Sequence, residues 1–465
     1  MTKVRSVGAV MTALLVACFA FQLNASMLSP ALVLMEKELN TTAAMIGLTQ
    51  TVFFTAAALF SLFLPRLGDM IGRRKLLTAM MVLTAIGCVI SALAGVTGSV
   101  ALLFIGRTIQ GVAGPTVPLC LIMLRVAVPD PKRYGTLMGV ITAVNGGIAG
   151  IDAIAGGWLA KNFGFASVFW TMAVIAAIAA VGVRSLTDES TVDSPQPMDW
   201  LGTLYLVVAV GAALTAINEI AKLKAANWLL VIILVLASAL CFLLFWRQEG
   251  KTEHPLVTRH YLRSRSTWAL LLTTILTMTG IFAIMNGIVP SIAQDAKFGA
   301  ALGADVVSFW TLTPYAIAGL VMGPVAGTLA GRFGYRKVLR YGLIGSLISL
   351  AILALTMNGA AAWVLLVVSI LAGLAYAGTA NIMLNGLGIV LSPSDNPGYL
   401  PGLNAGAFNL GAGISFAVLY AVMTSLGGGY GGHLGAIIAG GILLVLALGS
   451  SFLIPQPTGQ DEIAS

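Results

Sequence analysis

The sequence PRLGDMIGRRK at residues 65–75 resembles a second stretch, GTLAGRFGYRK at residues 327–337. At a constant offset the two stretches share Leu67/Leu329, Gly72/Gly334, Arg74/Arg336 and Lys75/Lys337. Each is a basic, glycine-containing segment that lies between two long apolar runs. A match of this kind at equivalent places indicates that the chain contains two homologous helical bundles.

The composition of the chain places both bundles in a membrane. Of the 465 residues, 58% are hydrophobic and only 9% are charged, and the mean hydropathy is +0.96. A soluble protein carries about 25% charged residues, which keep its surface hydrated. The net charge of +8 does not indicate nucleic-acid binding, because the basic residues form short clusters between apolar runs, where they orient membrane helices. We therefore predict an all-α membrane protein whose partner is the lipid bilayer and not a nucleic acid.

The apolar runs predict fourteen spanning helices, since about 20 apolar residues cross the hydrocarbon core. Their expected ranges are 9–33, 46–65, 77–95, 99–122, 135–158, 166–184, 201–218, 228–246, 266–292, 305–330, 340–357, 361–390, 402–424 and 435–454. Residues 1–185 and 263–465 are expected to form two six-helix bundles, and residues 186–262 an extra central helix pair with its linkers.

The basic residues predict the orientation of the helices. With a cytoplasmic N-terminus, 19 of the 25 basic residues fall in cytoplasmic segments and five in outer segments, while Arg107 lies within a helix. Cytoplasmic loops carry such an excess of Lys and Arg. We therefore predict a multi-pass protein of a prokaryotic-type inner (plasma) membrane, with both termini in the cytoplasm.

The sequence gives no support to an enzyme, a sensor or an ATP-driven pump. The longest polar segments are too short to fold alone, and the chain has no phosphate-binding loop, metal-spaced His/Cys cluster or nucleophile elbow. Cys18, Cys88, Cys120 and Cys241 all lie within apolar runs and are interpreted as buried thiols. We predict no catalytic residues, no cofactor and no metal.

Several motifs resemble those of the major facilitator superfamily. They are the loop at residues 68–75 and the R-x-x-Q-G pattern of Arg107, Gln110 and Gly111. MDWLG at residues 198–202 and HPLVTRHYLRSR at residues 254–265 flank the extra helix pair, and they resemble the fourteen-helix drug:proton antiporter branch. This resemblance covers nearly the whole chain. It implies a monomeric secondary-active transporter that exports a drug or metabolite in exchange for protons.

Two departures from that branch leave the direction of transport open. Asn24 stands where the branch usually has an acidic residue in the first helix, and DAIAGG at residues 152–157 replaces the usual G-P-x-x-G-G. The alternative is an uptake permease, either a proton symporter or a facilitator. Only the direction of transport under an imposed gradient separates the two hypotheses.

Two charged residues, Arg107 and Asp152, fall inside predicted spans at similar depths below the outer surface. A charge at the bilayer centre costs about 2.5–3.5 kcal/mol, so it persists where it faces a cavity or a partner. We hypothesise that Asp152 binds the coupling proton and that Arg107 tunes it. The alternative is a static pair that packs two helices together.

The repeated basic loops predict a conformational latch that holds the bundles together in one state and releases them in the other. A solvated cluster of loop charges is the alternative. The predicted latch residues are Asp69, Gly72, Arg73, Arg74, Arg332 and Arg336.

The resemblance implies a substrate cavity between the bundles, near the midplane. Side-chain amides in a span must face protein or water, and aromatic rings offer stacking surfaces. The residues predicted to line the cavity are Gln22, Asn24, Gln50, Gln110, Asn145, Phe282, Asn286, Tyr315, Tyr376, Asn381, Asn385, Phe408 and Asn409. For each amide the alternative is an interhelical hydrogen bond, and for each ring it is packing. Since few fixed charges are available, we predict that the substrate is a neutral, zwitterionic or weakly anionic organic solute.

Overall fold

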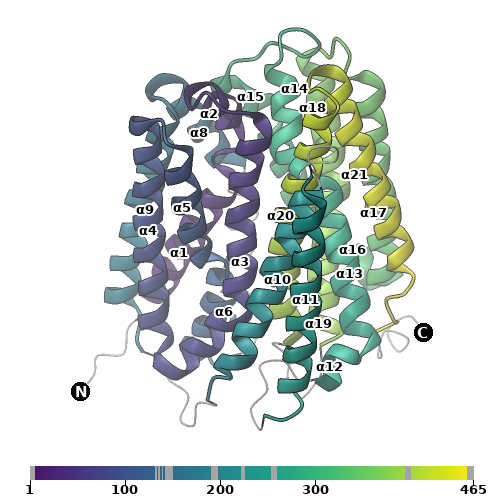
Figure 1. The fold of residues 1–465 in the computed structure, drawn as a ribbon. Helices are drawn as coiled ribbons and strands as arrows, with labels where there is room; N and C mark the ends of the chain where they lie inside the picture. The colour runs from purple at the N-terminus through teal and green to yellow at the C-terminus, as the bar shows by residue number, and fades with distance from the viewer. Residues whose placement is uncertain are drawn as a thin grey trace.

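A computed structural model describes residues 6–130, 133–134, 137–138, 140–141, 150–189, 197–220, 226–252, 259–392 and 399–457. Within these ranges all regular secondary structure is helical. Figure 1 shows the N-terminal helices on one side of the molecule, the C-terminal helices on the other, and α10 and α11 beside the junction. The predicted all-α membrane fold is confirmed.

The N-terminal half is built from long helices, several of which are interrupted. They are α1 (Val7–Ser26), η1 (Ser29–Ala31), α2 (Leu32–Glu38), α3 (Ala43–Ile71), α4 (Arg73–Thr97), α5 (Val100–Gln110), η2 (Gly111–Ala113), α6 (Thr116–Ala127), α8 (Ile151–Phe163) and α9 (Phe165–Leu186). The first span comprises α1, η1 and α2, and the fourth comprises α5, η2 and α6.

The C-terminal half repeats this plan after the central pair α10 (Trp200–Ile220) and α11 (Trp228–Gln248). Its elements are α12 (Arg259–Arg263), α13 (Arg265–Ala283), η5 (Ile284–Ile288), α14 (Val289–Gln294), α15 (Ala304–Trp310), α16 (Leu312–Phe333), α17 (Tyr335–Thr356), α18 (Ala362–Ala372), η6 (Gly373–Ala380), α19 (Asn381–Val390), α20 (Tyr399–Ser425) and α21 (Gly429–Ser451).

Thirteen helices in the described part of the chain are long and apolar enough to cross a membrane. They correspond to thirteen of the fourteen predicted spans. The remaining one, predicted at residues 135–158, falls largely outside the described residues, and α8 is its second half. The predicted domain limits near residues 186 and 262 stay predictions.

The glycine that the two repeats share has the same conformational role in both halves. Gly72 joins α3 to α4 with a φ of 103°, and Gly334 joins α16 to α17 with a φ of 83°. Side chains with a Cβ rarely adopt this region of φ, whereas glycine enters it readily. The sequence repeat therefore encodes the same tight turn between two spanning helices twice.

Among the spans that the structure describes, the first and fourth of each half contain a 3-10 or π-helical segment. The N-terminal half has the short 3-10 segments η1 and η2. The C-terminal half has the π-helical segments η5 and η6. Such departures leave backbone groups and side chains out of the regular helical register, and π segments are frequent at functional sites.

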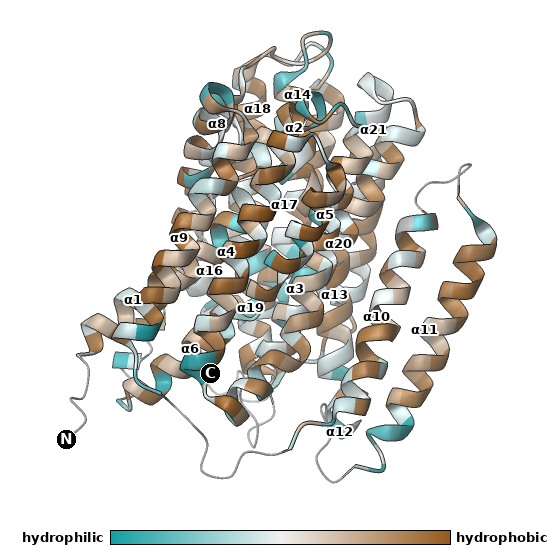
Figure 2. Cartoon of the chain, turned by 60° about the vertical axis from the view of Figure 1, so that its left-hand side comes forward, coloured by the Kyte–Doolittle hydropathy of each residue, from teal (hydrophilic) through white to brown (hydrophobic). Residues whose placement is uncertain are grey.

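The central pair attaches to the two halves through α10, while α11 packs mainly on α10. Figure 2 shows this pair standing beside the body, with apolar residues covering α11. Leu229, Leu236 and Leu243 of α11 are each more than 60% exposed. A helix that is apolar all round and so exposed requires lipid as its solvent.

The contact of Gly114 with α3 gives a test of the packing in the N-terminal half. A Cβ at Gly114 would lie 2.3 Å from the backbone oxygen of Ala57. We expect Gly114→Val to destabilise the protein by about 1–3 kcal/mol, because a backbone group cannot move aside as a side chain can. The measurement is thermal unfolding in detergent.

Gly211→Val on α10 is the matched control, since no atom lies within 4 Å of a Cβ built there. Equal melting temperatures for the two variants would contradict the close helix contact at Gly114.

Candidate functional site

Arg107 of α5 is fully buried and holds three helices together. Its Nη1 donates to the backbone oxygen of Asn24 on α1 (3.1 Å) and to Oε1 of Gln110 (2.8 Å). Its Nη2 donates to Oε1 of Gln50 on α3 (2.6 Å). The guanidinium also lies 4.1 Å from the ring centroid of Phe53, a cation–π geometry.

Of the carboxamides near Arg107, those of Gln50 and Gln110 turn their oxygens to it, whereas that of Asn24 bonds to other groups. Gln110 donates from Nε2 to the Ser91 hydroxyl (2.8 Å), so its Oε1 faces the guanidinium. Asn24 donates from Nδ2 to the backbone oxygen of Ala20 (2.8 Å), and its Oδ1 accepts from the Cys88 thiol (3.4 Å). Among the described residues no carboxylate pairs with Arg107. Amide dipoles and an aromatic ring therefore stabilise the cation in place of a counter-ion.

Asp152 of α8 is only 3% exposed, and its carboxylate is bonded on one side. Oδ2 is hydrogen-bonded to the Ser26 hydroxyl of α1. The Ser26 oxygen also lies 3.0 Å from the backbone oxygen of Gln22 and accepts from Gln22 Nε2 (3.1 Å). Oδ1 of Asp152 has no partner and is shielded from solvent.

Arg107 and Asp152 both contact α1, but the structure does not place them in an ion pair. Arg107 binds Asn24, and Asp152 binds Ser26, two residues farther along the same helix. The described ion pairs do not join the two side chains. A direct Arg107–Asp152 pair is therefore absent, and the predicted tuning of one by the other would pass through α1.

A chain of aromatic rings connects the Arg107 site to the C-terminal half. Phe53 lies edge-on to Phe54 (4.9 Å between centroids), and Phe54 lies edge-on to Phe282 of α13 (5.2 Å). Phe54 also stacks on Phe416 of α20 at 6.3 Å. These contacts cross the line where α3 and α20 join the two halves.

Some buried polar groups without a hydrogen-bond partner are shielded from solvent, and others are not. In the N-terminal half, Arg107 Nε, Gln50 Nε2 and Asp152 Oδ1 are unpaired but shielded from solvent. In the C-terminal half, Asn409 and the Tyr315 hydroxyl are without a hydrogen-bond partner among the described residues, yet neither is shielded. In the C-terminal half, Asn409 and Tyr315 are therefore buried residues whose polar groups remain accessible.

Several other residues predicted to line the cavity make contacts within the C-terminal half. Asn286 donates to the Phe282 backbone oxygen (3.0 Å), and Tyr376 contacts the Met278 sulfur with its hydroxyl (2.6 Å) and stacks near Tyr315 (6.5 Å). Asn385 donates to Oδ1 of Asn381 (3.1 Å).

Phe408 is partly buried against the core. Asn145 lies outside the described residues. Gln22 bonds to Ser26 within α1, next to Asp152, and Asn24 contacts Arg107 through its backbone oxygen. Gln50 and Gln110 make interhelical hydrogen bonds, which was the alternative to lining the cavity.

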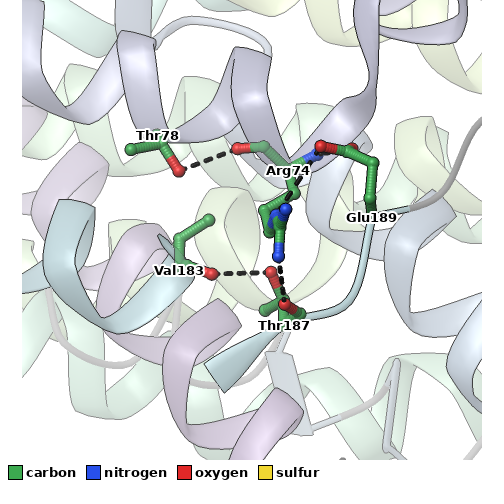
Figure 3. A network of polar contacts seen from close by, with 5 residues as sticks. All are labelled: Arg74, Thr78, Val183, Thr187 and Glu189. Carbon is green, nitrogen blue, oxygen red and sulfur yellow. Dashed lines mark hydrogen bonds and ion pairs between the residues drawn. The ribbon is translucent and has the colours of Figure 1, made fainter. Parts of the chain in front are cut away.

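Of the predicted latch residues, Arg74 binds the end of α9 and the residues after it rather than the opposite half (Figure 3). Arg74 donates from its backbone to Oε1 of Glu189 (2.9 Å) and from Nη1 to the backbone oxygen of Thr187 (3.5 Å). Asp69 pairs with Arg73 on the next helical turn (2.7 Å). Glu189 was missed by the sequence analysis, since nothing in the sequence near it marks it as a partner of the distant loop.

The equivalent C-terminal loop makes no such ion pairs. Neither Arg332 nor Arg336 forms an ion pair within the described residues, and Nε of Arg336 has no partner. The predicted latch between the two bundles is therefore not formed in this conformation, and its role in another state stays a prediction.

Four contacts join the two halves at the end that the predicted topology places outside, and we call this set the outer closure. Lys161 pairs with Asp305 (2.8 Å), the Ser308 hydroxyl donates to the Ala153 backbone oxygen (3.0 Å), and Thr313 donates to that of Gly150 (2.7 Å). Gln294 donates to the backbone oxygen of Pro30 (3.3 Å). The structure therefore has the halves in contact at this end.

Comparison with known proteins places these features in a family context. A model described as Major Facilitator Superfamily matches residues 14–199 and 198–416. A uridine/deoxyuridine transporter from Lactococcus lactis subsp. cremoris is 58% identical over 462 residues, which cover 98% of this chain and 96% of that protein. Multidrug resistance protein Stp from Mycobacterium tuberculosis is 25% identical over 84% of this chain and 70% of its own length.

Among solved structures, a mutant of the nucleoside transporter NupG superposes with a TM-score of 0.66 at 14% identity. The superposition covers 96% of this chain and 99% of that one. Sequence identity this low shows a shared fold alone.

The outer closure gives a charge-swap test. Lys161 is about half exposed, so its pair with Asp305 is worth at most about 1 kcal/mol. We expect Lys161→Glu to oppose two carboxylates and to increase the population that is open at this end by up to about fivefold. The measurement is the distance distribution between spin labels at the ends of α8 and α15.

The double variant Lys161→Glu/Asp305→Lys should restore the closed distribution, because it reverses the pair without removing it. A swap that stays as open as the single variant would show that the ion pair does not stabilise the closure.

Proposed function

The chain belongs to the Major Facilitator Superfamily, and we propose that within it this multi-pass membrane protein takes up a pyrimidine nucleoside such as uridine or deoxyuridine. The observation that carries the proposal is the 58% identity, over almost the full length of both chains, to a uridine/deoxyuridine transporter. Uptake is the proposed direction because such substrates are metabolites that a cell can reuse.

The chemistry of the C-terminal half supports a neutral substrate. A nucleoside carries no charge near neutral pH, offers several hydrogen-bonding groups and has one flat ring. The open groups of Asn409 and Tyr315 are uncharged, and the rings of Phe54, Phe282 and Phe416 lie at the junction of the halves. Binding sites for small molecules combine such apolar walls with a few polar groups that fix orientation.

The comparisons favour uptake over the drug export that the sequence resemblance first predicted. Membership of the superfamily is confirmed. The drug-exporting relatives share only about a quarter of their residues with this chain, whereas the nucleoside transporter shares more than half. Antiport and multidrug efflux therefore have less support than the alternative of an uptake permease.

We further propose that uptake is driven by a proton that binds Asp152. The guanidinium of Arg107 stays charged, so the carboxyl of Asp152 is the group of the two that can exchange a proton. A protonated Asp152 can donate to Ser26, and the Ser26 hydroxyl can then donate to the Gln22 backbone oxygen. Every contact of the Ser26 oxygen is then used as a hydrogen bond, including the one that it accepts from Gln22 Nε2.

The position of Asp152 supports a connection between the proton and the outer closure. Asp152 contacts α1 of its own half, while the backbone oxygen of the adjacent Ala153 accepts from Ser308 of the other half. A change in the Asp152–Ser26 contact therefore acts on the same turn of α8 that closes the outer end. Such a two-state contact is what coupling requires.

Transport of labelled uridine into proteoliposomes tests the proposed substrate. With an inward proton gradient of one pH unit, we expect accumulation of up to about tenfold for one proton per nucleoside. Unlabelled deoxyuridine should compete, whereas lipophilic cations should not. Export of drugs under the same gradient, with no movement of uridine, would establish the alternative function instead.

The variant Asp152→Asn tests the proton site. We expect it to lose accumulation, with a ratio near one, while exchange of labelled for unlabelled uridine continues, because an amide cannot carry a proton but keeps the shape of the site. Asp130→Asn, at an exposed position, is the control and should accumulate uridine as the wild type does. Full accumulation by Asp152→Asn would remove Asp152 from the mechanism.

A further inference from the structure

The carboxamide of Asn409 on α20 is buried but makes no hydrogen bond to a described residue. The residue is 9% exposed, and within the described ranges no group donates to or accepts from its side chain. It is also not among the buried polar atoms that are shielded from solvent. About 90% or more of buried polar groups have a hydrogen-bond partner, so an open carboxamide at this depth indicates a place for a ligand.

Asn404, one and a half turns away on the same helix, shows what a structural amide looks like here. Its Oδ1 accepts from the Thr274 hydroxyl (2.7 Å), and its Nδ2 donates to the backbone oxygen of Leu384 (3.2 Å). Both ends of that carboxamide join α20 to its neighbours. Asn409 makes no such bridge, so the packing of α20 does not account for an amide at this position.

The position of Asn409 on α20 directs it toward the junction of the two halves. Residues seven apart lie on one face of an α-helix, and Phe416 is seven residues beyond Asn409. Phe416 stacks on Phe54 of the N-terminal half and lies edge-on to Phe282 of α13. Asn409 therefore lies on the face of α20 that carries the aromatic contacts, two turns nearer the cytoplasmic end in the predicted topology.

We propose that the Asn409 carboxamide binds the N3–H and O4 edge of the pyrimidine base of the substrate, an inference that rests on the proposed function. A carboxamide presents an N–H donor beside a carbonyl acceptor, and uracil presents the complementary pair, O4 beside N3–H. Asn and Gln read the edges of nucleobases in this two-bond manner. Phe282, the only one of the three rings that is partly exposed, offers an apolar surface on which a flat base can pack.

Recognition at the base, rather than at the 2′ position of the sugar, also agrees with the similar transporter. Its name covers both uridine and deoxyuridine, which share the base and differ in the 2′-hydroxyl. A site that accepts both does not depend on the 2′-hydroxyl, which leaves the base among the groups that it can recognise. An uncharged side chain with both a donor and an acceptor, such as a carboxamide, can recognise the base.

The test compares uridine with 3-methyluridine, in which the N3–H is replaced by a methyl group, as inhibitors of labelled uridine uptake into proteoliposomes. We expect wild type to prefer uridine by about three- to tenfold, the range for one neutral hydrogen bond. In Asn409→Leu the KM for uridine should rise by a similar factor, and the preference should fall to about one.

Asn409→Asp is the second variant, because it keeps the size of the side chain but loses its donors. It should raise the KM for uridine, because its second oxygen faces the O4 acceptor, while it still accepts from N3–H and so keeps the preference over 3-methyluridine. This rise in KM is the readout if Asn409→Leu fails to fold. Thr424→Val on the same helix is the matched control, since its hydroxyl bonds only to the Tyr420 backbone oxygen. This control should retain both the KM and the preference.

Two results would overturn the assignment in different ways. If wild type transports uridine and both Asn409 variants keep its KM and its preference over 3-methyluridine, Asn409 does not bind the base, and the proposed function stands. If wild type moves no nucleoside at all, the proposed function itself fails, and the assignment of Asn409 fails with it.

Discussion

A guanidinium buried without a counter-ion is the interaction on which the rest of this structure depends. Arg107 has no exposed surface, and its contacts draw together α1, α3 and α5. Leaving a charge unpaired in such a place costs several kcal/mol, so the surrounding groups are constrained to point their oxygens toward it. The carboxamides of Gln50 and Gln110 are therefore fixed by electrostatics, while that of Asn24 is held by Ala20 and Cys88.

The two halves differ in the kind of polar group that they bury. In the N-terminal half, Arg107 and Asp152 are buried and their unpaired atoms are shielded from solvent, whereas in the C-terminal half the uncharged carboxamide of Asn409 stays open. The aromatic contacts of Phe53, Phe54 and Phe282 join the two regions, and α1 joins Arg107 to Asp152. A proton in one half and a neutral solute in the other can thus act on one shared interface.

Sequence reasoning identified the charged residues of the site but not their partners. Arg107 and Asp152 stood out because charges within apolar spans are costly, and both are buried as expected. Their pairing with each other did not hold, because Ser26 occupies Asp152 and amides occupy Arg107. Glu189 and the Lys161–Asp305 pair could not be found from sequence, since their partners lie 115 and 144 residues away and no local pattern records such contacts.

The sequence by itself determined the membrane, thirteen of the predicted spans and the repeat of the two halves, because hydropathy and the glycine turns at Gly72 and Gly334 act locally. Only the tertiary structure decided which polar residues serve packing and which remain open. Asn404 and Asn409 look alike in the sequence, and they differ because the side chain of one bonds to Thr274 and Leu384 while that of the other makes no hydrogen bond within the described residues. A hydrogen bond depends on the relative positions of two groups in space, and helix packing sets those positions.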